Sequence, residues 1–144
     1  MNRINITTLG VKDVAKAAEF YKKLGFITPS TEENPSIVFF NNGGTKLALY
    51  PLEELAKDIN ESDPPKISTG FNGFTLAYNA KTKEEVDLVF TQIEELGGKI
   101  IKSPKPTFWG GYGGYFQDLD GYYWEVAYAD SWIFDDNDML VITE

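Results

Sequence analysis

One arrangement of elements occurs twice along the chain, and this repeat constrains the fold more than any other feature. In each copy, a β-branched, apolar segment precedes an amphipathic helix that stops at a Leu-Gly pair, Leu24-Gly25 in the first copy and Leu96-Gly97 in the second. The leading strands are expected at Ile4–Val11 and Phe71–Asn79, and three further strands are expected after each helix. The sequence therefore predicts an α+β fold of two tandem β-α-β-β-β modules.

Both helices carry start signals and a one-sided apolar face. Asp13 is the expected N-cap of the first helix, and Thr82 with Glu85 forms the capping-box pattern that opens the second. Such helices are expected to pack on a sheet through their apolar faces. Those faces consist of Val14, Ala17, Ala18, Tyr21 and Leu24 in the first helix, and of Val86, Val89, Phe90, Ile93 and Leu96 in the second.

The remaining segments give the expected domain limits. A short helix is expected within Pro51–Asn60, and the polar, Pro-Pro-containing segment 61–69 is the best linker candidate. The first module is thus expected at residues 1–60, the second at 70–129, and a C-terminal tail at 130–144 that folds back onto the body. The other expected strands are Phe26–Pro29, Ser36–Phe40, Thr45–Tyr50 and Lys99–Lys102, together with the two strands of an aromatic hairpin.

The aromatic hairpin lies between Phe108 and Tyr128, a segment that contains nine aromatic residues and five glycines. Asp120-Gly121 between two aromatic runs is a strong hairpin signal and predicts a tight turn. Glu125 is the single carboxylate of the second strand, which suggests a ligand position. Trp109 precedes Gly110-Gly111, and this loop is expected to act as a lid or to pack at an interface.

Composition excludes several classes of function. The chain has no histidine and no cysteine, so it lacks imidazole bases, Ser-His and Cys-His pairs, and thiolate or imidazole metal ligands. A formal net charge of -9 argues against binding to nucleic acid or to anionic membranes, which requires basic patches. No apolar run approaches the ~20 residues of a membrane span, so a cytoplasmic protein is expected.

Two motifs resemble the vicinal oxygen chelate superfamily, which includes glyoxalase I, extradiol dioxygenases, fosfomycin-resistance enzymes and bleomycin-binding proteins. They are VxDVxKAxEFYxKLGF at Val11–Phe26 and D-x-D-G-x-x-x-E at Asp118–Glu125. The resemblance implies that the modules form a curved mixed sheet around a cavity. Enzymes of this superfamily commonly hold a divalent metal through four strand positions, which fall here on Ile6, Ala48, Gly73 and Glu125. Since Glu125 alone has a donor side chain, no metal site and no cofactor are expected, although a divalent metal stays open as an alternative.

Strand alternation around these positions predicts the ligand-binding side chains. They are Thr8, Tyr50, Thr75, Tyr123 and Glu125, with Trp109 from the loop. The first hypothesis is a binding protein for a small aromatic or cationic molecule, as in the bleomycin-resistance members. The alternative is a glyoxalase-like lyase or isomerase, or a dioxygenase-related enzyme, in which Glu125 is an acid/base or metal ligand. A third is a non-catalytic dimeric module. The expected partners are a small molecule and a second copy of the chain.

Overall fold

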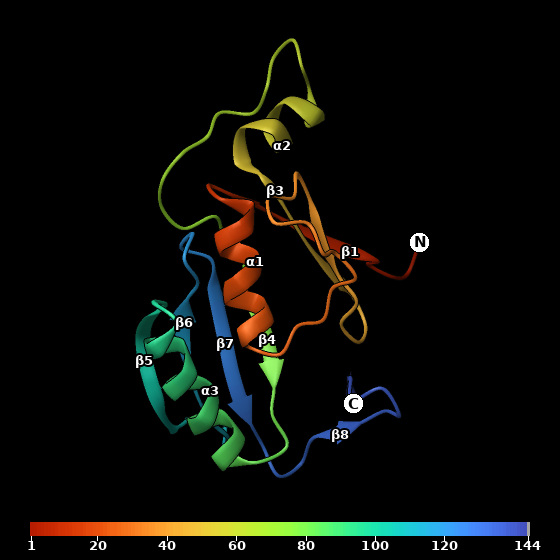
Figure 1. Ribbon diagram of the computed structural model, residues 1–144. Coiled ribbons are helices and arrows are strands. Elements are labelled where there is room, and N and C mark those ends of the chain that lie inside the picture. Colours follow the sequence, from red (N-terminus) through yellow and green to blue (C-terminus); the bar gives the residue numbers. More distant parts are fainter. Residues whose placement is uncertain (144) are drawn as a thin grey trace. The chain divides into compact units, whose positions relative to one another are not determined.

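The computed structural model describes residues 1–143, and the chain divides into two compact units, Met1–Asn72 (unit 1) and Gly73–Glu144 (unit 2) (Figure 1). The division falls shortly after the expected linker, in a stretch from residue 60 to residue 75 that contains no helix or strand. Within residues 1–143, no helix is both long and apolar enough to cross a membrane.

Unit 1 contains a three-stranded mixed sheet and two helices. The sheet has the order β1-β3-β2, in which β1 and β3 are parallel and β2 is antiparallel to β3. The elements in chain order are β1 (Ile6–Val11), α1 (Val14–Lys23), β2 (Val38–Phe40), β3 (Lys46–Pro51) and α2 (Leu52–Ile59). The expected helices of this module are both present.

The start and end of α1 follow the sequence signals. The Asp13 carboxylate accepts a hydrogen bond from the Lys16 backbone N–H at 3.0 Å, and Gly25 adopts a φ of 108°, which favours glycine after a helix. Tyr21 on the buried face of α1 contacts the rings of Phe26 and Phe40, with centroid separations of 5.4 and 6.0 Å. These aromatic contacts hold α1 on the sheet of unit 1.

Unit 2 repeats the topology of unit 1 with one more strand. Its sheet has the order β4-β7-β6-β5, in which β4 and β7 are parallel and the other neighbours are antiparallel. In both units, therefore, the first strand pairs in parallel with the last. The predicted α+β class and its internal duplication are confirmed. The elements are β4 (Leu76–Asn79), α3 (Lys83–Glu95), β5 (Lys99–Pro106), β6 (Tyr112–Gln117) and β7 (Tyr123–Tyr128).

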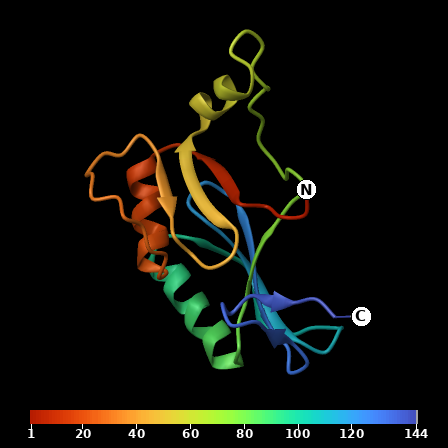
Figure 2. The same cartoon turned by 90° about the vertical axis from the view of Figure 1, so that its right-hand side faces the viewer.

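Helix α3 lies along one face of the unit 2 sheet (Figure 2). The Thr82 hydroxyl accepts from the Glu85 N–H at 3.1 Å, as expected of the N-cap, but the Glu85 carboxylate accepts from the Lys81 N–H at 2.8 Å, one residue before the N-cap position that a capping box uses. Phe90 of α3 packs edge-to-face on Phe116 of β6, whose other neighbour is Trp124 of β7 in a parallel stack. Every second residue of β7 thus points toward the helix.

One expected strand is absent and another is shorter than expected, and the backbone explains both differences. Residues Phe26–Pro29 form no strand, because Pro29 has no N–H and the Thr28 hydroxyl takes the place of a ladder donor, bonding to the Phe39 carbonyl at 2.7 Å. The strand expected at Phe71–Asn79 begins only at Leu76. Gly70 and Gly73 adopt φ values of 111° and 82°, which are incompatible with an extended strand.

Two further expectations in unit 2 require correction. Strand β5 continues to Pro106, past the expected end at Lys102, because it is an edge strand and tolerates prolines that lack a ladder donor. The hairpin is closed by the five-residue loop 118–122 and not by a two-residue Asp120-Gly121 turn. Within it, the Asp118 carboxylate accepts from the N–H groups of Asp120 and Tyr122 at 3.0 and 2.9 Å, so this carboxylate serves the turn.

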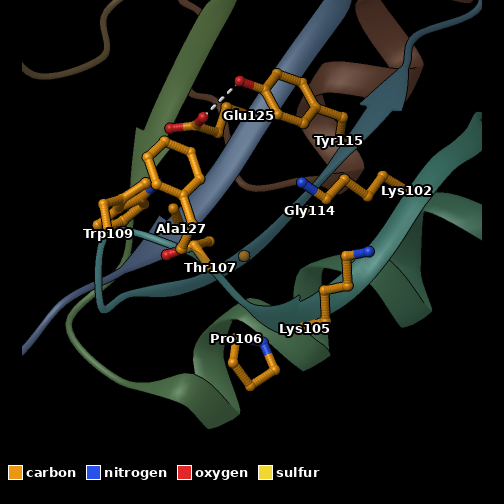
Figure 3. A pocket seen from close by; sticks show the side chains of 11 residues that line it. Lys102, Lys105, Pro106, Thr107, Trp109, Gly114, Tyr115, Glu125 and Ala127 are labelled. Atoms are coloured by element: carbon orange, nitrogen blue, oxygen red, sulfur yellow. Dashed lines mark hydrogen bonds between the residues drawn. The ribbon is translucent and has the colours of Figure 1, made fainter.

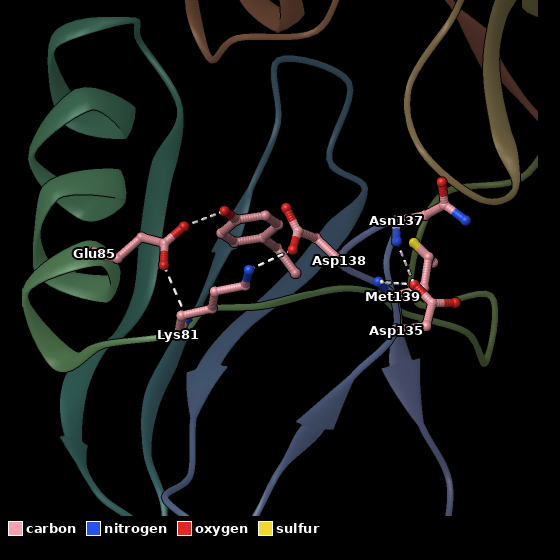
Figure 4. A network of polar contacts seen from close by, with 7 residues as sticks. Lys81, Glu85, Asp135, Asn137, Asp138 and Met139 are labelled. Carbon is pink, nitrogen blue, oxygen red and sulfur yellow. Dashed lines mark hydrogen bonds and ion pairs between the residues drawn. The ribbon is translucent and has the colours of Figure 1, made fainter.

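The C-terminal tail forms a small hairpin of β8 (Ile133–Phe134) and β9 (Leu140–Val141). The Lys81 ammonium forms an ion pair with Asp138 (Figure 4). It also lies 5.7 Å from the Phe134 ring centroid. The Asp135 carboxylate accepts from the N–H of Met139 at 3.0 Å, so the acidic middle of the tail is a turn. The tail therefore contacts the loop that leads into α3.

Candidate functional site

A pocket of about 410 Å³ lies on the face of the unit 2 sheet opposite α3 (Figure 3). Its volume is in the range of about 300–1,000 Å³ that is typical of small-molecule sites. Alternation along β7 places Glu125 and Ala127 on this face, while Trp124 and Val126 are buried on the helix side. The pocket is lined by Lys102, Lys105, Pro106, Thr107, Phe108, Trp109, Gly113, Gly114, Tyr115, Glu125 and Ala127.

The floor of the pocket consists of small residues. Gly113 of β6 pairs with Ala127 of β7, so this row of the sheet presents almost no side chain to the open face. A Cβ atom at position 113 would lie 2.5 Å from the Val126 carbonyl oxygen and 2.7 Å from the Ala127 Cβ, closer than such atoms approach. The close approach of β7 therefore requires glycine at position 113, and the missing side chain leaves the space that forms the pocket.

A polar row borders the floor. Tyr115 of β6 pairs with Glu125 of β7, and the Tyr115 hydroxyl donates a hydrogen bond to Glu125 Oε2 at 2.5 Å. This bond to a carboxylate, helped by partial burial and by the negative charge of Glu125, raises the pKa of Tyr115 to about 12. Tyr115 is therefore a hydrogen-bond donor at neutral pH. The second oxygen of Glu125 is available to a ligand, since no described residue donates to it.

The loop between β5 and β6 provides the aromatic wall of the pocket. The Thr107 hydroxyl accepts from the Gly111 N–H at 2.8 Å, which closes the loop, and Gly110 adopts a φ of 93°. The ring of Trp109 covers Gly111 and stacks on Trp132 of the tail, with centroids 5.6 Å apart and planes inclined by 23°. One tryptophan of the pocket wall is thus held by a second tryptophan from the C-terminal segment.

Two lysines of β5 complete the lining. Lys102 and Lys105 both contribute side chains to the pocket, as their positions in Figure 3 show. Neither forms an ion pair with any carboxylate among residues 1–143, although the chain is strongly acidic. The pocket therefore contains two ammonium groups and one carboxylate that do not neutralise one another through direct contact.

The structure brings together two of the six predicted site residues. Trp109 and Glu125 line the same pocket, whereas Tyr123 lies on β7 at the hairpin end and does not line it. Thr75 precedes β4 and is also outside the pocket. Thr8 in β1 and Tyr50 in β3 belong to unit 1, and their roles stay predictions.

Six lining side chains were missed from the sequence: Lys102, Lys105, Pro106, Thr107, Phe108 and Tyr115. Tyr115 could have been found, because pairing across the five-residue loop places it opposite Glu125. The lysines could not, because the register of β5 is irregular between Ile100 and Lys102 and again between Lys102 and Lys105. Counting by twos along an irregular strand assigns side chains to the wrong face.

The residues at the four metal positions implied by the resemblance do not fit a metal ion. Ile6, Ala48 and Gly73 have no donor atoms in their side chains, and Glu125 already accepts a hydrogen bond from Tyr115. Within the part of the chain that the structure describes, no three carboxylate side chains group in a way that could hold a metal. The side chains at these positions therefore supply one ligand where structural and catalytic metal sites use three or more.

Two units with a repeated topology, each with its first strand parallel to its last, and a pocket beside a glutamate of the final strand define a class of proteins built from tandem β-α-β modules, here with three strands in unit 1 and four in unit 2. The sequence profile of the Glyoxalase/Bleomycin resistance protein/Dioxygenase superfamily matches residues 3–126, and the chain belongs to this superfamily. No curated protein sequence matches the chain.

Solved structures with the same fold include three informative relatives. A glyoxalase-related enzyme from Fulvimarina pelagi is 23% identical, with a TM-score of 0.88 and full coverage (100%) of both chains. A hypothetical protein from S. aureus is 26% identical, with a TM-score of 0.75, covering 90% of this chain and 94% of that one. A lactoylglutathione lyase from Agrobacterium tumefaciens is 25% identical, with a TM-score of 0.68, covering 94% of this chain and 99% of that one.

Proposed function

We propose that this protein binds a small aromatic molecule in the pocket of unit 2. The observation that carries the proposal is the pocket itself, whose lining combines Trp109 and the exposed Phe108 with the hydrogen-bonded pair of Tyr115 and Glu125. An aromatic ring would stack on the loop side, and a donor group of the ligand would reach the second oxygen of Glu125. This is the mixture of apolar walls and few polar groups that small-molecule sites use.

A titration of small aromatic compounds, followed by calorimetry, tests the proposal. Trp109→Ala removes the stacking wall and Glu125→Gln removes the carboxylate charge, so each is expected to weaken binding by about tenfold. Leu119→Ala is the matched control, because Leu119 has the same 43% exposure as Trp109 but does not line the pocket. Failure of every aromatic compound to bind, or equal binding by the Trp109 variant, would contradict the proposal.

A second candidate is catalysis of proton transfer without a metal, as a glyoxalase-like lyase or isomerase or a dioxygenase-related enzyme. The observation that favours it is the 2.5 Å bond between Tyr115 and Glu125 inside a pocket, where the carboxylate would accept a proton from carbon and the phenol would donate to a carbonyl oxygen. Deuterium exchange at the carbon next to the carbonyl of an aromatic ketone, followed by NMR, distinguishes the two candidates. An enzyme predicts exchange that Glu125→Gln abolishes, and a binding protein predicts none.

We also propose that the protein forms a homodimer and is located in the cytoplasm. Light scattering of the purified protein tests the first.

A further inference from the structure

We infer that the pocket of unit 2 selects ligands that carry a negative charge next to the aromatic ring, and that Lys102 and Lys105 bind this anionic group. The inference rests on the proposed function and names the chemical class of its ligand. It also replaces the cationic ligand of the first hypothesis, because the two lysines inside the pocket favour an anion on the β5 side.

The first argument is the position of the two lysines relative to Glu125. Lys102 of β5 pairs with Tyr115 of β6, which pairs with Glu125 of β7, so the three side chains form one row across the sheet. Two strand spacings separate the backbones of Lys102 and Glu125, which is roughly 10 Å. The hydroxyl of the central residue, Tyr115, donates its hydrogen bond to Glu125 and not toward Lys102. The row therefore has a negative end and a positive end with room for a ligand between them.

The second argument is the shape of β5, whose irregularities turn both lysines toward the pocket. Ile100 pairs with Phe116, which contacts α3, so regular alternation would place Lys102 on the helix face. A shift of register after Ile100 instead sets Lys102 opposite Tyr115 on the pocket face. Bulges of this kind redirect side chains and are frequent beside functional sites.

A second shift of register occurs further along β5, between Lys102 and Lys105. Lys105 lies three positions after Lys102, and an odd separation would place the two side chains on opposite faces of a regular strand. A second irregularity brings Lys105 opposite Gly113, so it also lines the pocket. Two successive departures from the regular ladder thus each place an ammonium group at the same cavity, and neither ammonium is neutralised by a carboxylate of residues 1–143.

The third argument concerns what the two ammonium groups can bind. Two lysines near a floor of glycine and alanine supply two positive point charges with rotatable N–H donors. Such groups bind a carboxylate or another compact anion without the fixed planar geometry of an arginine. The aromatic wall at Trp109 fixes the rest of the molecule. The matching ligand is a small aromatic acid whose ring faces the tryptophan and whose anion faces β5.

Three probes that share a phenyl ring and differ in charge test the inference by calorimetric titration at low and moderate salt. They are phenylacetate (an anion), phenylacetamide (neutral) and phenethylamine (a cation). The acid is expected to bind about tenfold more tightly than the amide, with the difference shrinking as salt screens the charges. Lys102→Gln and Lys105→Gln are each expected to reduce the affinity for phenylacetate by about threefold to tenfold and to leave phenylacetamide unchanged.

Lys99→Gln is the matched control, because Lys99 lies on the same strand, pairs with Gln117 and does not line the pocket. Equal affinity for acid and amide, preference for the amine, or a double lysine variant that binds phenylacetate as well as wild type would overturn the inference and leave the aromatic pocket standing. If none of the three probes binds, the proposed function fails together with the inference. Unfolding temperatures of all variants show whether a loss reflects misfolding.

Discussion

Replacement of Glu125 by Gln is expected to lower the pKa of Tyr115 substantially. The hydrogen bond to the Glu125 carboxylate is the largest cause that raises this pKa from 10 to about 12, followed by partial burial and the carboxylate charge. A glutamine keeps the shape and an acceptor oxygen but has no charge, so the pKa is expected to fall by about one to two units.

The assay is an NMR titration of labelled tyrosine Cζ carbons between pH 8 and 11. At pH 10, a tyrosine with a pKa of 12 is only about 1% ionised, whereas an ordinary tyrosine is about half ionised, so the difference is large where the protein is still folded. Asp87→Asn is the matched control. The Asp87 carboxylate accepts from the Tyr112 hydroxyl at 2.6 Å and raises the pKa of that tyrosine instead.

Each variant is thus expected to affect only its own tyrosine: Glu125→Gln lowers the pKa of Tyr115 alone, and Asp87→Asn lowers the pKa of Tyr112 alone. Ordinary titration of Tyr115 near pH 10 in the wild-type protein would refute the reasoning. So would a Glu125→Gln variant in which Tyr115 still ionises as late as in wild type, because burial and not the carboxylate would then be the cause.

Three further outcomes are expected. Gly113→Ala should lower the free energy of unfolding by about 1–3 kcal/mol in chemical denaturation, since its Cβ would lie 2.5 Å from the Val126 carbonyl oxygen; an unchanged midpoint would contradict the packing described. Trp132→Ala should shift the fluorescence of Trp109 to the red and cost about 1 kcal/mol by removing the stack, and an unshifted emission would mean that the stack does not form. The raised pKa of Tyr115 stabilises the fold fully below pH 10 and is lost as pH rises through about 12, so unfolding free energy should fall by about 1 kcal/mol over that range after allowance for solvent screening; stability that rises with pH there would reverse the sign.

Much of the fold could be predicted because its signals are local. The N-caps at Asp13 and Thr82 and the glycine at position 25 each act within one helical turn, and the structure forms all three. The repeat of these signals then indicates two modules of one topology. The strand ends were less predictable, because backbone conformations such as the positive φ at Gly70 and Gly73 leave little trace in composition.

Part of the candidate site could be predicted from the sequence and part could not. Glu125 and Trp109 were accessible from the sequence because β7 alternates regularly and because tryptophan in a glycine-rich loop is conspicuous. Lys102 and Lys105 were not, since their direction depends on two irregularities in the pairing of β5 with β6. Strand alternation predicts which face a side chain occupies only where the strand pairing is regular. The lysine side of the pocket could therefore be identified only from the structure.

The irregular pairing of β5 also affects how the protein behaves at high concentration. Strand β5 is an edge of the unit 2 sheet, and an exposed edge can recruit a strand of another molecule and start aggregation. Pro104 and Pro106 have no N–H to offer to such a strand, and the interrupted register prevents a continuous intermolecular ladder. Lateral addition through this edge is therefore disfavoured, and the chain gains protection from misassembly from the same distortion that shapes its pocket.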